Sequence, residues 1–280
     1  MFTNTLEDSE KNYPRKLLRR NNWSNLNGTW QFRLDHEKKY NRPNQIPDWP
    51  LTIQVPFAPE SPASGIGDND FHSRVWYQRT FEFYKTDMRV ILHFGAVDYE
   101  ARVWINNHYL GHHEGGHTPF SFDVTDLLNS GGDQIITVRA DDDPLDLTKP
   151  RGKQDWQRHP HSIWYPRTTG IWQTVWMEEV AQTYVERLRC TPMLERWEIS
   201  IEAFIEGTYK EGLQLEVKVK SGSKLLARDH YEVVNKEVHR KIAMSDPGID
   251  DYRNELLWSP EKPTLIDIEI KLIDEGKVLD

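Results

Sequence analysis

The sixteen residues Ile163–Glu178, IWYPRTTGIWQTVWME, decide the fold. They place a Pro-Arg-Thr-Thr-Gly turn between an aromatic cluster and a segment in which Trp172, Thr174 and Trp176 alternate with mostly apolar residues. Side chains along a β-strand point alternately to opposite faces, so these three would share one face and their neighbours the other. Both faces then carry large apolar groups, which predicts a strand inside a β-sandwich.

Short alternating segments continue through the first part of the chain, each bounded by Gly, Asn, Asp or Pro. They are Thr29–Leu34, Val75–Phe83, Val90–Phe94, Ala101–Ile105, Phe120–Val124 and Ile135–Ala140. No stretch of about 12 residues has the apolar period of a helix, although one helical turn is predicted at Asp126–Asn129. The sequence therefore predicts an all-β fold, a sandwich or jelly roll, and not an α/β sheet.

A change in composition near residue 181 predicts a domain boundary, because nine of the eleven tryptophans precede it. The segments beyond it are Trp197–Ile205, Leu213–Val219, Leu225–Val234, Val238–Met244 and Leu265–Ile273. Several short strands in about a hundred residues are typical of an immunoglobulin-like β-sandwich. We therefore expect a sandwich or jelly-roll domain at 1–180 and an immunoglobulin-like domain at 181–280.

Charge and cysteine content narrow the classes of function. The net charge is −9 and the pI is near 5.7. Nucleic acids and anionic membranes need a basic patch, so neither is an expected partner. Cys190 is the only cysteine, which excludes an intrachain disulfide and a Cys-ligated zinc site. Because the N-terminus does not look like a signal peptide and no run of about 18 apolar residues occurs, a cytoplasmic location is expected.

The segment His113–His117, HEGGH, fits the H-E-x-x-H pattern of zinc proteases. That chemistry needs both histidines on one helical turn, and two consecutive glycines would cost such a helix about 2 kcal/mol. We interpret the segment instead as a glycine-rich loop between two strands. An adventitious metal patch is the alternative, but histidines on an exposed loop are favoured, and no metal or cofactor is predicted: His108, His112, His113, His117.

Two acidic runs raise the question of a calcium site, because calcium takes oxygen ligands. Asp141-Asp142-Asp143 precedes Pro144, an arrangement typical of the end of a strand. Asp68-Asn69-Asp70 lacks the glycine and the distal glutamate of a calcium loop. We therefore assign neither run to a metal site.

A long polar loop, RGKQDWQRHPHS at Arg151–Ser162, is the candidate functional segment. Loops of this length in a compact sandwich are usually functional or mobile. Most tryptophans lie within predicted strands, whereas Trp156 and Trp164 flank this loop. Indole rings stack on the apolar faces of sugars while neighbouring polar side chains bind the hydroxyls. Contact with a sugar and plain packing between domains are equal alternatives for this loop.

Several motifs, in the same order, resemble the N-terminal domains of glycoside hydrolase family 2, the family of β-galactosidases, β-glucuronidases and β-mannosidases. Its jelly-roll domain is resembled by NLNGTWQFRLD (Asn25–Asp35), IQVPFAPES (Ile53–Ser61), WYQRTFE (Trp76–Glu82), the segment Leu92–Leu128 and YPRTTGIWQTVWME (Tyr165–Glu178). LWSPEKPTLIDIEI (Leu257–Ile270) resembles the end of its immunoglobulin-like domain. The resemblance covers essentially the whole chain, and it replaces the protease interpretation with a family loop at Gly111–Gly116.

The resemblance implies a retaining β-glycosidase whose two catalytic glutamates lie on a (β/α)₈ barrel after the sandwiches. No sequence of barrel length is present here, so no catalytic residue is assigned. The acid/base of the family follows an asparagine, but Asn254-Glu255 lies in the second sandwich, beside three residues expected to be buried: Leu256, Leu257 and Trp258. Because Asp280 comes only three residues after a predicted hairpin turn at Glu275-Gly276-Lys277, we expect a truncated chain.

In the resembled family, the first sandwich contributes side chains to the rim of the sugar pocket. An aspartate six residues before the glycine of the closing motif helps to bind the sugar. That glycine corresponds to Gly170, and Trp164 stands at the aspartate position, where an indole cannot accept hydrogen bonds from hydroxyls. We therefore predict substrate contact by Trp164, Trp156, Asp155 and Arg167, with no support for galactoside or glucuronide specificity.

Three functions compete. The favoured one is the non-catalytic N-terminal region of a family 2 glycosidase of carbohydrate metabolism, inactive alone, with a β-glycoside and the missing C-terminal barrel as partners. The second is a free-standing carbohydrate-binding module that holds sugar through Trp156 and Trp164. The third is a ligand-free structural sandwich that assembles into homo-oligomers.

Overall fold

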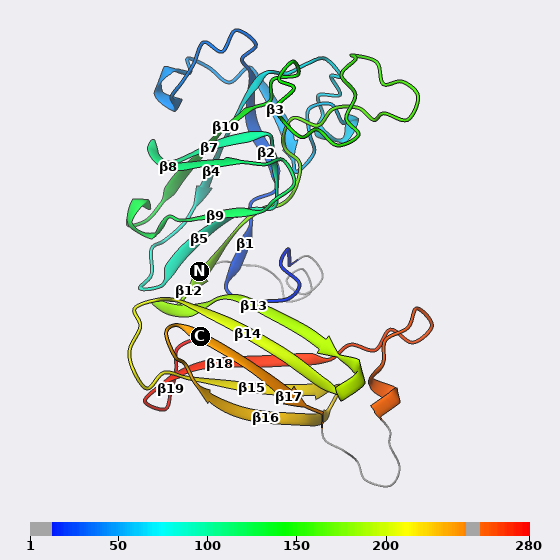
Figure 1. The fold of residues 1–280 in the computed structure, drawn as a ribbon. Helices are drawn as coiled ribbons and strands as arrows, with labels where there is room; N and C mark the ends of the chain where they lie inside the picture. The colour runs from blue at the N-terminus through cyan, green and yellow to red at the C-terminus, as the bar shows by residue number, and fades with distance from the viewer. Residues whose placement is uncertain (1–12, 245–252) are drawn as a thin grey trace. The chain divides into compact units, whose positions relative to one another are not determined.

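The computed structural model describes residues 13–244 and 253–280, and this part of the chain is built almost entirely of antiparallel β-strands (Figure 1). The predicted all-β fold is confirmed. The chain divides into two compact units. Among the described residues, unit 1 contains Tyr13, Pro14 and Arg20–Glu179, and unit 2 contains Arg15–Arg19 and the chain from Val180 to Asp280. None of the helices among the described residues is long and apolar enough to cross a membrane.

Unit 1 is a jelly-roll sandwich of two main sheets. The larger sheet, in the order β3-β2-β4-β10-β7-β8, consists of β2 (Gly28–Leu34), β3 (Leu51–Val55), β4 (Arg74–Glu82), β7 (Glu100–Ile105), β8 (His108–Glu114) and β10 (Asp133–Asp141). The smaller sheet, in the order β1-β12-β5-β9, consists of β1 (Trp23–Asn25), β5 (Arg89–Phe94), β9 (Phe120–Asp123) and β12 (Val175–Val180). A short pair joins β6 (Val97–Asp98) to β11 (Gly170–Ile171), and three 3₁₀ turns connect strands: η1 (Pro43–Gln45), η2 (Pro62–Ser64) and η3 (Thr125–Leu127).

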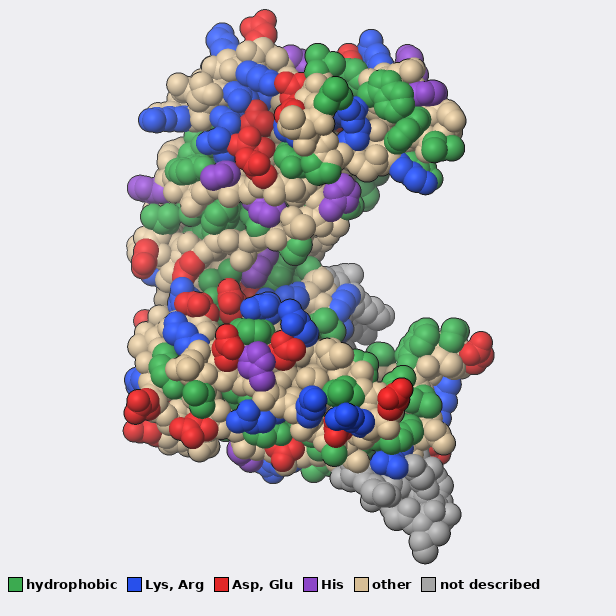
Figure 2. All heavy atoms as spheres, in the orientation of Figure 1, with side chains coloured by type: hydrophobic (Ala, Val, Ile, Leu, Met, Phe, Trp, Pro, Cys, Tyr) green, Lys and Arg blue, Asp and Glu red, His purple; other side chains and the backbone are tan. Residues whose placement is uncertain are grey.

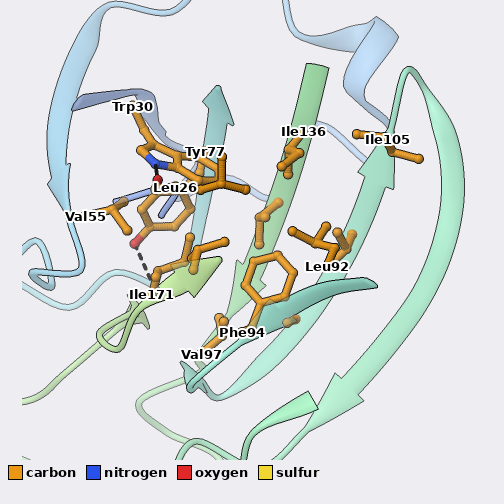
Figure 3. Close-up of a cluster of buried hydrophobic side chains, with 14 of the residues drawn as sticks. Leu26, Trp30, Val55, Tyr77, Leu92, Phe94, Val97, Ile105, Ile136 and Ile171 are labelled. Atoms are coloured by element: carbon orange, nitrogen blue, oxygen red, sulfur yellow. Dashed lines mark hydrogen bonds between the residues drawn. The ribbon is translucent and has the colours of Figure 1, made fainter. Parts of the chain in front are cut away.

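The core of unit 1 forms where the inner faces of the two main sheets meet. Trp30, Tyr77 and Ile136 come from the larger sheet, and Leu92 and Phe94 come from the smaller one (Figure 3). All five are essentially inaccessible to solvent. The buried Trp30 indole donates from Nε1 to the Leu26 carbonyl at 2.8 Å, so its polar atom is satisfied as well. Truncation of such an aromatic residue to alanine typically costs about 3–5 kcal/mol.

The segment after Gly170 is not the continuous strand that its alternation predicts. β11 ends at Ile171 and β12 begins at Val175, because the residues between them leave the ladder. There, Gly95 N donates to the Thr174 carbonyl at 2.9 Å, and the Trp172 indole donates to the Gly116 carbonyl at 2.7 Å. Alternation alone could not foresee these partners, which come from distant loops.

A second correction concerns the histidine-rich segment. His113–His117 was predicted to be a glycine-rich loop between two strands, and the loop begins only at Gly115. His113 and Glu114 are the end of strand β8, which pairs antiparallel with β7. β8 lies at the edge of the sheet, and none of its side chains is fully buried. It therefore lacks the apolar alternation from which a strand is recognised. The strand geometry still excludes the helix that a zinc protease would need.

Unit 2 is an immunoglobulin-like sandwich of two sheets. Its three-stranded sheet consists of β13 (Thr183–Met193), β14 (Glu198–Gly207) and β17 (Glu237–Ala243), and its four-stranded sheet of β15 (Gln214–Ser221), β16 (Lys224–Glu232), β18 (Asp267–Asp274) and β19 (Lys277–Val278). The remaining 3₁₀ turns are η4 (Leu194–Arg196) and η5 (Arg253–Leu256). β13 was missed because only its first three residues are buried and its register shifts between Val185 and Arg187.

One expectation about unit 2 is wrong. Leu257 and Trp258, expected to be buried beside Asn254-Glu255, are exposed, with 60% of Trp258 accessible. They follow η5, where the chain runs along the surface, and they line an apolar groove together with Trp197. Asn254-Glu255 lies on this short turn and not at the end of a parallel strand.

Candidate functional site

The Arg151–Ser162 loop is tied together at its base by backbone hydrogen bonds. Asp155 N donates to the Tyr165 carbonyl and Tyr165 N donates to the Lys153 carbonyl, both at 2.9 Å. Gln154 and Tyr165 form an isolated parallel bridge at the same place. The two ends of the loop therefore lie side by side, and the residues between them project as one closed loop (Figure 1). Such closure fixes the position of side chains that a free loop would leave unrestrained.

Asp155 anchors the inside of this loop. Its carboxylate accepts hydrogen bonds from Gln157 N at 2.9 Å, from His161 N at 2.8 Å and from His161 Nδ1 at 2.7 Å. The residue is fully buried. Burial alone would raise the pKa of Asp155, but these hydrogen bonds outweigh it and hold the pKa below its ordinary value. The carboxylate is thus ionised and engaged by the loop itself.

The two tryptophans predicted to contact substrate lie together on the loop. Their ring centroids are 5.0 Å apart at an angle of 68°. His161 also packs edge-on against Trp156, with ring centroids 5.4 Å apart. Trp156 is 48% exposed, and the adjacent Ile163 and Tyr165 are exposed as well. Hydrophobic side chains and histidines gather where Figure 1 draws this green loop, as Figure 2 shows at the upper right.

Arg167, the fourth predicted residue, contacts Asp142 and Phe71 and not the two tryptophans. Its guanidinium forms an ion pair with Asp142, and both side chains are buried. It also lies 5.6 Å from the centre of the Phe71 ring. Burial raises the pKa of Asp142, although Arg167 acts against that rise. The pair holds the turn that precedes Gly170 against the end of β10.

Two buried carboxylates that the sequence did not reveal lie under the same turn. Glu60 accepts a hydrogen bond from Thr169 N at 3.2 Å, and its other oxygen, Oε1, has no hydrogen-bond partner. Burial raises the pKa of Glu60 to about 7. Asp98 accepts from Gln154 Nε2 at 2.8 Å, and burial together with the Asp142 charge raises its pKa to about 6. Carboxylates with raised pKa values are characteristic of functional sites.

The sequence contains a signal for these carboxylates. Asp98 directly follows Ala96-Val97, and all three residues are buried, so an acid stands at the end of an apolar buried run. Buried acids are rare unless they are hydrogen-bonded or paired. Gln154 connects the cluster to the loop, because its amide nitrogen donates to Asp98 while its oxygen accepts from Thr168 N at 2.9 Å.

The acidic run at the end of β10 is occupied by cations of the protein itself. Asp141 binds Arg74 and Arg139, Asp142 binds Arg167, and Asp143 binds Lys38. In the part of the chain that the structure describes, no group of three or more His, Cys, Asp or Glu side chains is arranged to hold a metal ion. The run marks the end of a strand, as its Asp-Pro chemistry indicates.

Comparison with protein families gives two matches. Residues 38–143 match the model described as glycosyl hydrolases family 2, sugar binding domain, and residues 183–280 match the model described as glycosyl hydrolases family 2. Together they cover most of both units. The order of the two matches is the order of the two sandwiches.

Individual relatives agree with these matches. A β-galactosidase of Thermoanaerobacter pseudethanolicus is 27% identical over 81% of this chain and 30% of its own length. A mouse β-glucuronidase is 27% identical over 72% of this chain and 36% of its own length. The chain thus spans about a third of the length of these relatives.

Solved structures share the fold. A Bifidobacterium dentium β-glucuronidase superimposes with a TM-score of 0.68 at 22% identity, over 96% of this chain and 48% of that one. A Ruminococcus gnavus β-glucuronidase gives 0.70 at 20% identity, over 96% and 45%. The two successive matches, in the order of the two sandwiches, show that the chain belongs to glycoside hydrolase family 2.

Proposed function

We propose that this chain is the non-catalytic N-terminal region of a family 2 glycosidase that hydrolyses β-glycosides with retention of configuration. The observation that carries the proposal is the pair of consecutive family matches over a chain that spans only about a third of its glycosidase relatives. Retaining hydrolysis needs two carboxylates about 5–5.5 Å apart around one glycosidic bond. Glu60 accepts a hydrogen bond from Thr169 N, Asp98 accepts one from Gln154, and Asp142 is paired with Arg167, so these buried carboxylates are not proposed as that catalytic pair.

Within that enzyme, the role proposed for this chain is to contribute the Trp156–Trp164 pair to sugar recognition. Half of the Trp156 surface is accessible, and its ring is braced by Trp164 and His161. A braced indole loses little conformational freedom when a sugar stacks on it. Asp155 supports this pair through its hydrogen bond with His161, whereas Arg167 is held in an ion pair with Asp142. A cytoplasmic location belongs to the same proposal, because the single cysteine suits a reducing compartment.

The first test is hydrolysis. The purified 280-residue chain is expected to give no saturable hydrolysis of aryl β-glycosides, and the gene is expected to continue into a barrel with an Asn-Glu at a strand end. Saturable turnover by the 280-residue chain alone would contradict the assignment.

The second test concerns the aromatic pair in the complete enzyme. Trp156→Ala is expected to raise KM for aryl β-glycosides about tenfold with little change in kcat, because stacking contributes roughly 1–1.5 kcal/mol to binding. Tyr84→Ala removes another exposed ring of unit 1 and serves as the control. An unchanged KM in the Trp156 variant would remove the loop from substrate recognition.

A second candidate function is a free-standing carbohydrate-binding module, favoured by the same exposed pair. It predicts saturable sugar binding by the 280-residue chain and a gene that ends near codon 280. The two candidates therefore differ in the gene sequence, which is read independently of any binding result.

A further inference from the structure

A polar hollow of about 530 Å³ opens on the outer face of the larger sheet of unit 1. Val75, Val138 and Ala101 point into the core from three neighbouring strands. Because side chains alternate along a strand, the residues next to them face outward. Arg74, Asp141, Glu100 and Glu114 are directly opposite one another across β4, β10, β7 and β8. Figure 2 shows acidic and basic side chains side by side over the part of unit 1 where Figure 1 labels β10.

This outer-face basin is lined by Lys38, Arg74, Tyr99, Glu100, Glu114, Arg139, Asp141, Asp143, Asp146, Thr148 and Lys149. Its floor is held in place by internal ion pairs. Arg74 Nε donates to Asp141 Oδ1 at 2.5 Å, and Arg139 Nε donates to Asp141 Oδ2 at 2.6 Å. All three residues are buried. The floor is therefore a rigid polar surface that no rearrangement needs to prepare.

The rim of the basin differs from its floor in how its polar groups are engaged. Among the described residues, no side-chain hydrogen bond or ion pair engages the Glu114 carboxylate, the Tyr99 hydroxyl or the Lys149 ammonium. Lys149 Nζ lies 5.1 Å from the centre of the Tyr99 ring. Other charged groups of the rim already have partners. Lys38 forms an ion pair with Asp143 at 3.3 Å, and Asp146 Oδ1 accepts a hydrogen bond from Thr148 N. One acceptor, two donors and an aromatic ring thus border one hollow.

The balance of charge around the basin selects the class of ligand. Four lining side chains are cationic (Lys38, Arg74, Arg139, Lys149) and five are anionic (Glu100, Glu114, Asp141, Asp143, Asp146), which leaves a net charge of −1. The net negative charge would repel an anionic ligand, and both arginines of the basin are already paired with Asp141. A volume of this size lies in the usual range for small-molecule sites, about 300–1,000 Å³.

We infer that the outer-face basin is a second carbohydrate site, which binds an uncharged saccharide through Glu114, Lys149 and the Tyr99 ring. Glu114 accepts hydrogen bonds from sugar hydroxyls, and Lys149 donates to them. The Tyr99 ring offers an apolar surface to the sugar's C–H groups. This inference rests on the proposed role in a glycosidase, and it adds a binding surface separate from the Trp156–Trp164 pair.

Titration calorimetry on the 280-residue chain tests the inference, with methyl β-D-glucopyranoside, methyl β-D-galactopyranoside and methyl β-D-glucuronide as probes. At least one neutral probe is expected to bind. Glu114→Ala and Lys149→Ala are each expected to weaken that binding about tenfold, and Glu114→Gln less. Glu195→Ala, at an exposed carboxylate of unit 2, is the matched control. Unfolding midpoints equal to that of the unmodified chain establish that each variant is folded.

Three results would overturn the basin: no binding of either neutral probe, preferred binding of the glucuronide, or binding lost in Trp156→Ala but retained in both basin variants. None of these touches the glycosidase assignment, which depends on the continuation of the gene and on hydrolysis by the complete enzyme. Failure of the basin and failure of the proposed function are therefore distinguishable.

Discussion

The carboxylates with the largest pKa shifts differ in direction between the two sandwiches, being raised in unit 1 and lowered in unit 2. In unit 1, burial raises the pKa of Glu60 to about 7 and, with Asp142, that of Asp98 to about 6. In unit 2, hydrogen bonds from Arg228 and Lys218 lower the pKa of Glu216 to about 2, and hydrogen bonds from three lysines do the same for Glu269. Glu216 and Glu269 add to stability when ionised, whereas Glu60 and Asp98 cost stability when ionised. Acids retained at such a cost are more often there for a site than for the fold.

A substitution that strains the turn above the raised carboxylates of unit 1 should have the largest effect. Gly170 has a φ of +75°, and a Cβ there would collide with the Tyr77 hydroxyl. Gly170→Ala is therefore expected to lower the free energy of unfolding of unit 1 by about 2–5 kcal/mol, the sum of left-handed strain and overpacking. Tryptophan fluorescence during urea unfolding would report it, since nine of the eleven tryptophans precede residue 181.

Gly152→Ala is the matched control for that substitution. Gly152 also has a positive φ, +57°, but no atom lies within 4 Å of the position that a Cβ would take. It should cost only the strain, about 1–2 kcal/mol. Equal losses in the two variants would mean that the contact between the turn and Tyr77 contributes nothing.

Glu60→Gln tests whether the raised pKa of Glu60 makes the stability of unit 1 depend on pH. The pKa of Glu60 is raised above its unfolded value of 4.5, so the folded state binds more protons in between, and stability falls as the pH rises from about 4.5 to about 7. A shift of this size corresponds to roughly 3 kcal/mol. The variant should lose the part of this slope that Glu60 provides and keep the comparable part that comes from Asp98, whose pKa is raised from 3.8 to about 6. Unfolding midpoints of unit 1 between pH 4 and pH 8 measure it.

Glu37→Gln is the control for Glu60→Gln, because Glu37 is exposed and its side chain has no hydrogen bond or ion pair within the described part of unit 1. It should leave the pH dependence of unit 1 unchanged. A Glu60 variant with the pH slope of the unmodified chain would assign that slope to other groups.

The strands of both sandwiches were largely predictable from the sequence, and the reason is visible in the strands that were missed. β14 alternates buried and partly exposed positions, and β4 begins with four buried residues, so their apolar side chains reveal both strands. β8 at the edge of its sheet and β13 with its register shift bury too few residues for that. The order of apolar and polar residues along the sequence indicates which strands have a buried face. A strand that buries few side chains has no such order and cannot be recognised from it.

The candidate site was predictable only in its exposed part. The Trp156–Trp164 pair follows from a long loop with aromatic ends, and the structure brings the two rings together. The neighbourhood of Glu60, Asp98 and Asp142 joins residues from widely separated parts of the chain. Which carboxylates meet depends on how the β-strands are ordered in space, and a single sequence does not contain that order.

Acid should affect unit 2 by a smaller amount and in the opposite direction. Glu216 is paired with Arg228 at 2.6 Å, with Lys218 at 3.0 Å and with His230 at 3.0 Å. Its pKa is lowered from 4.5 to about 2, so the stability that it provides is present above pH 4.5 and is lost as the pH falls towards 2. The protection factors of the β15 and β16 amides in hydrogen exchange should fall over that range, and Glu216→Gln should remove part of that fall. Glu232→Gln, an exposed acid on β16, should not. If Glu216→Gln and Glu232→Gln behave alike, the ion pairs of Glu216 contribute nothing measurable to the stability of unit 2. The contrast between the two units then rests on unit 1 alone.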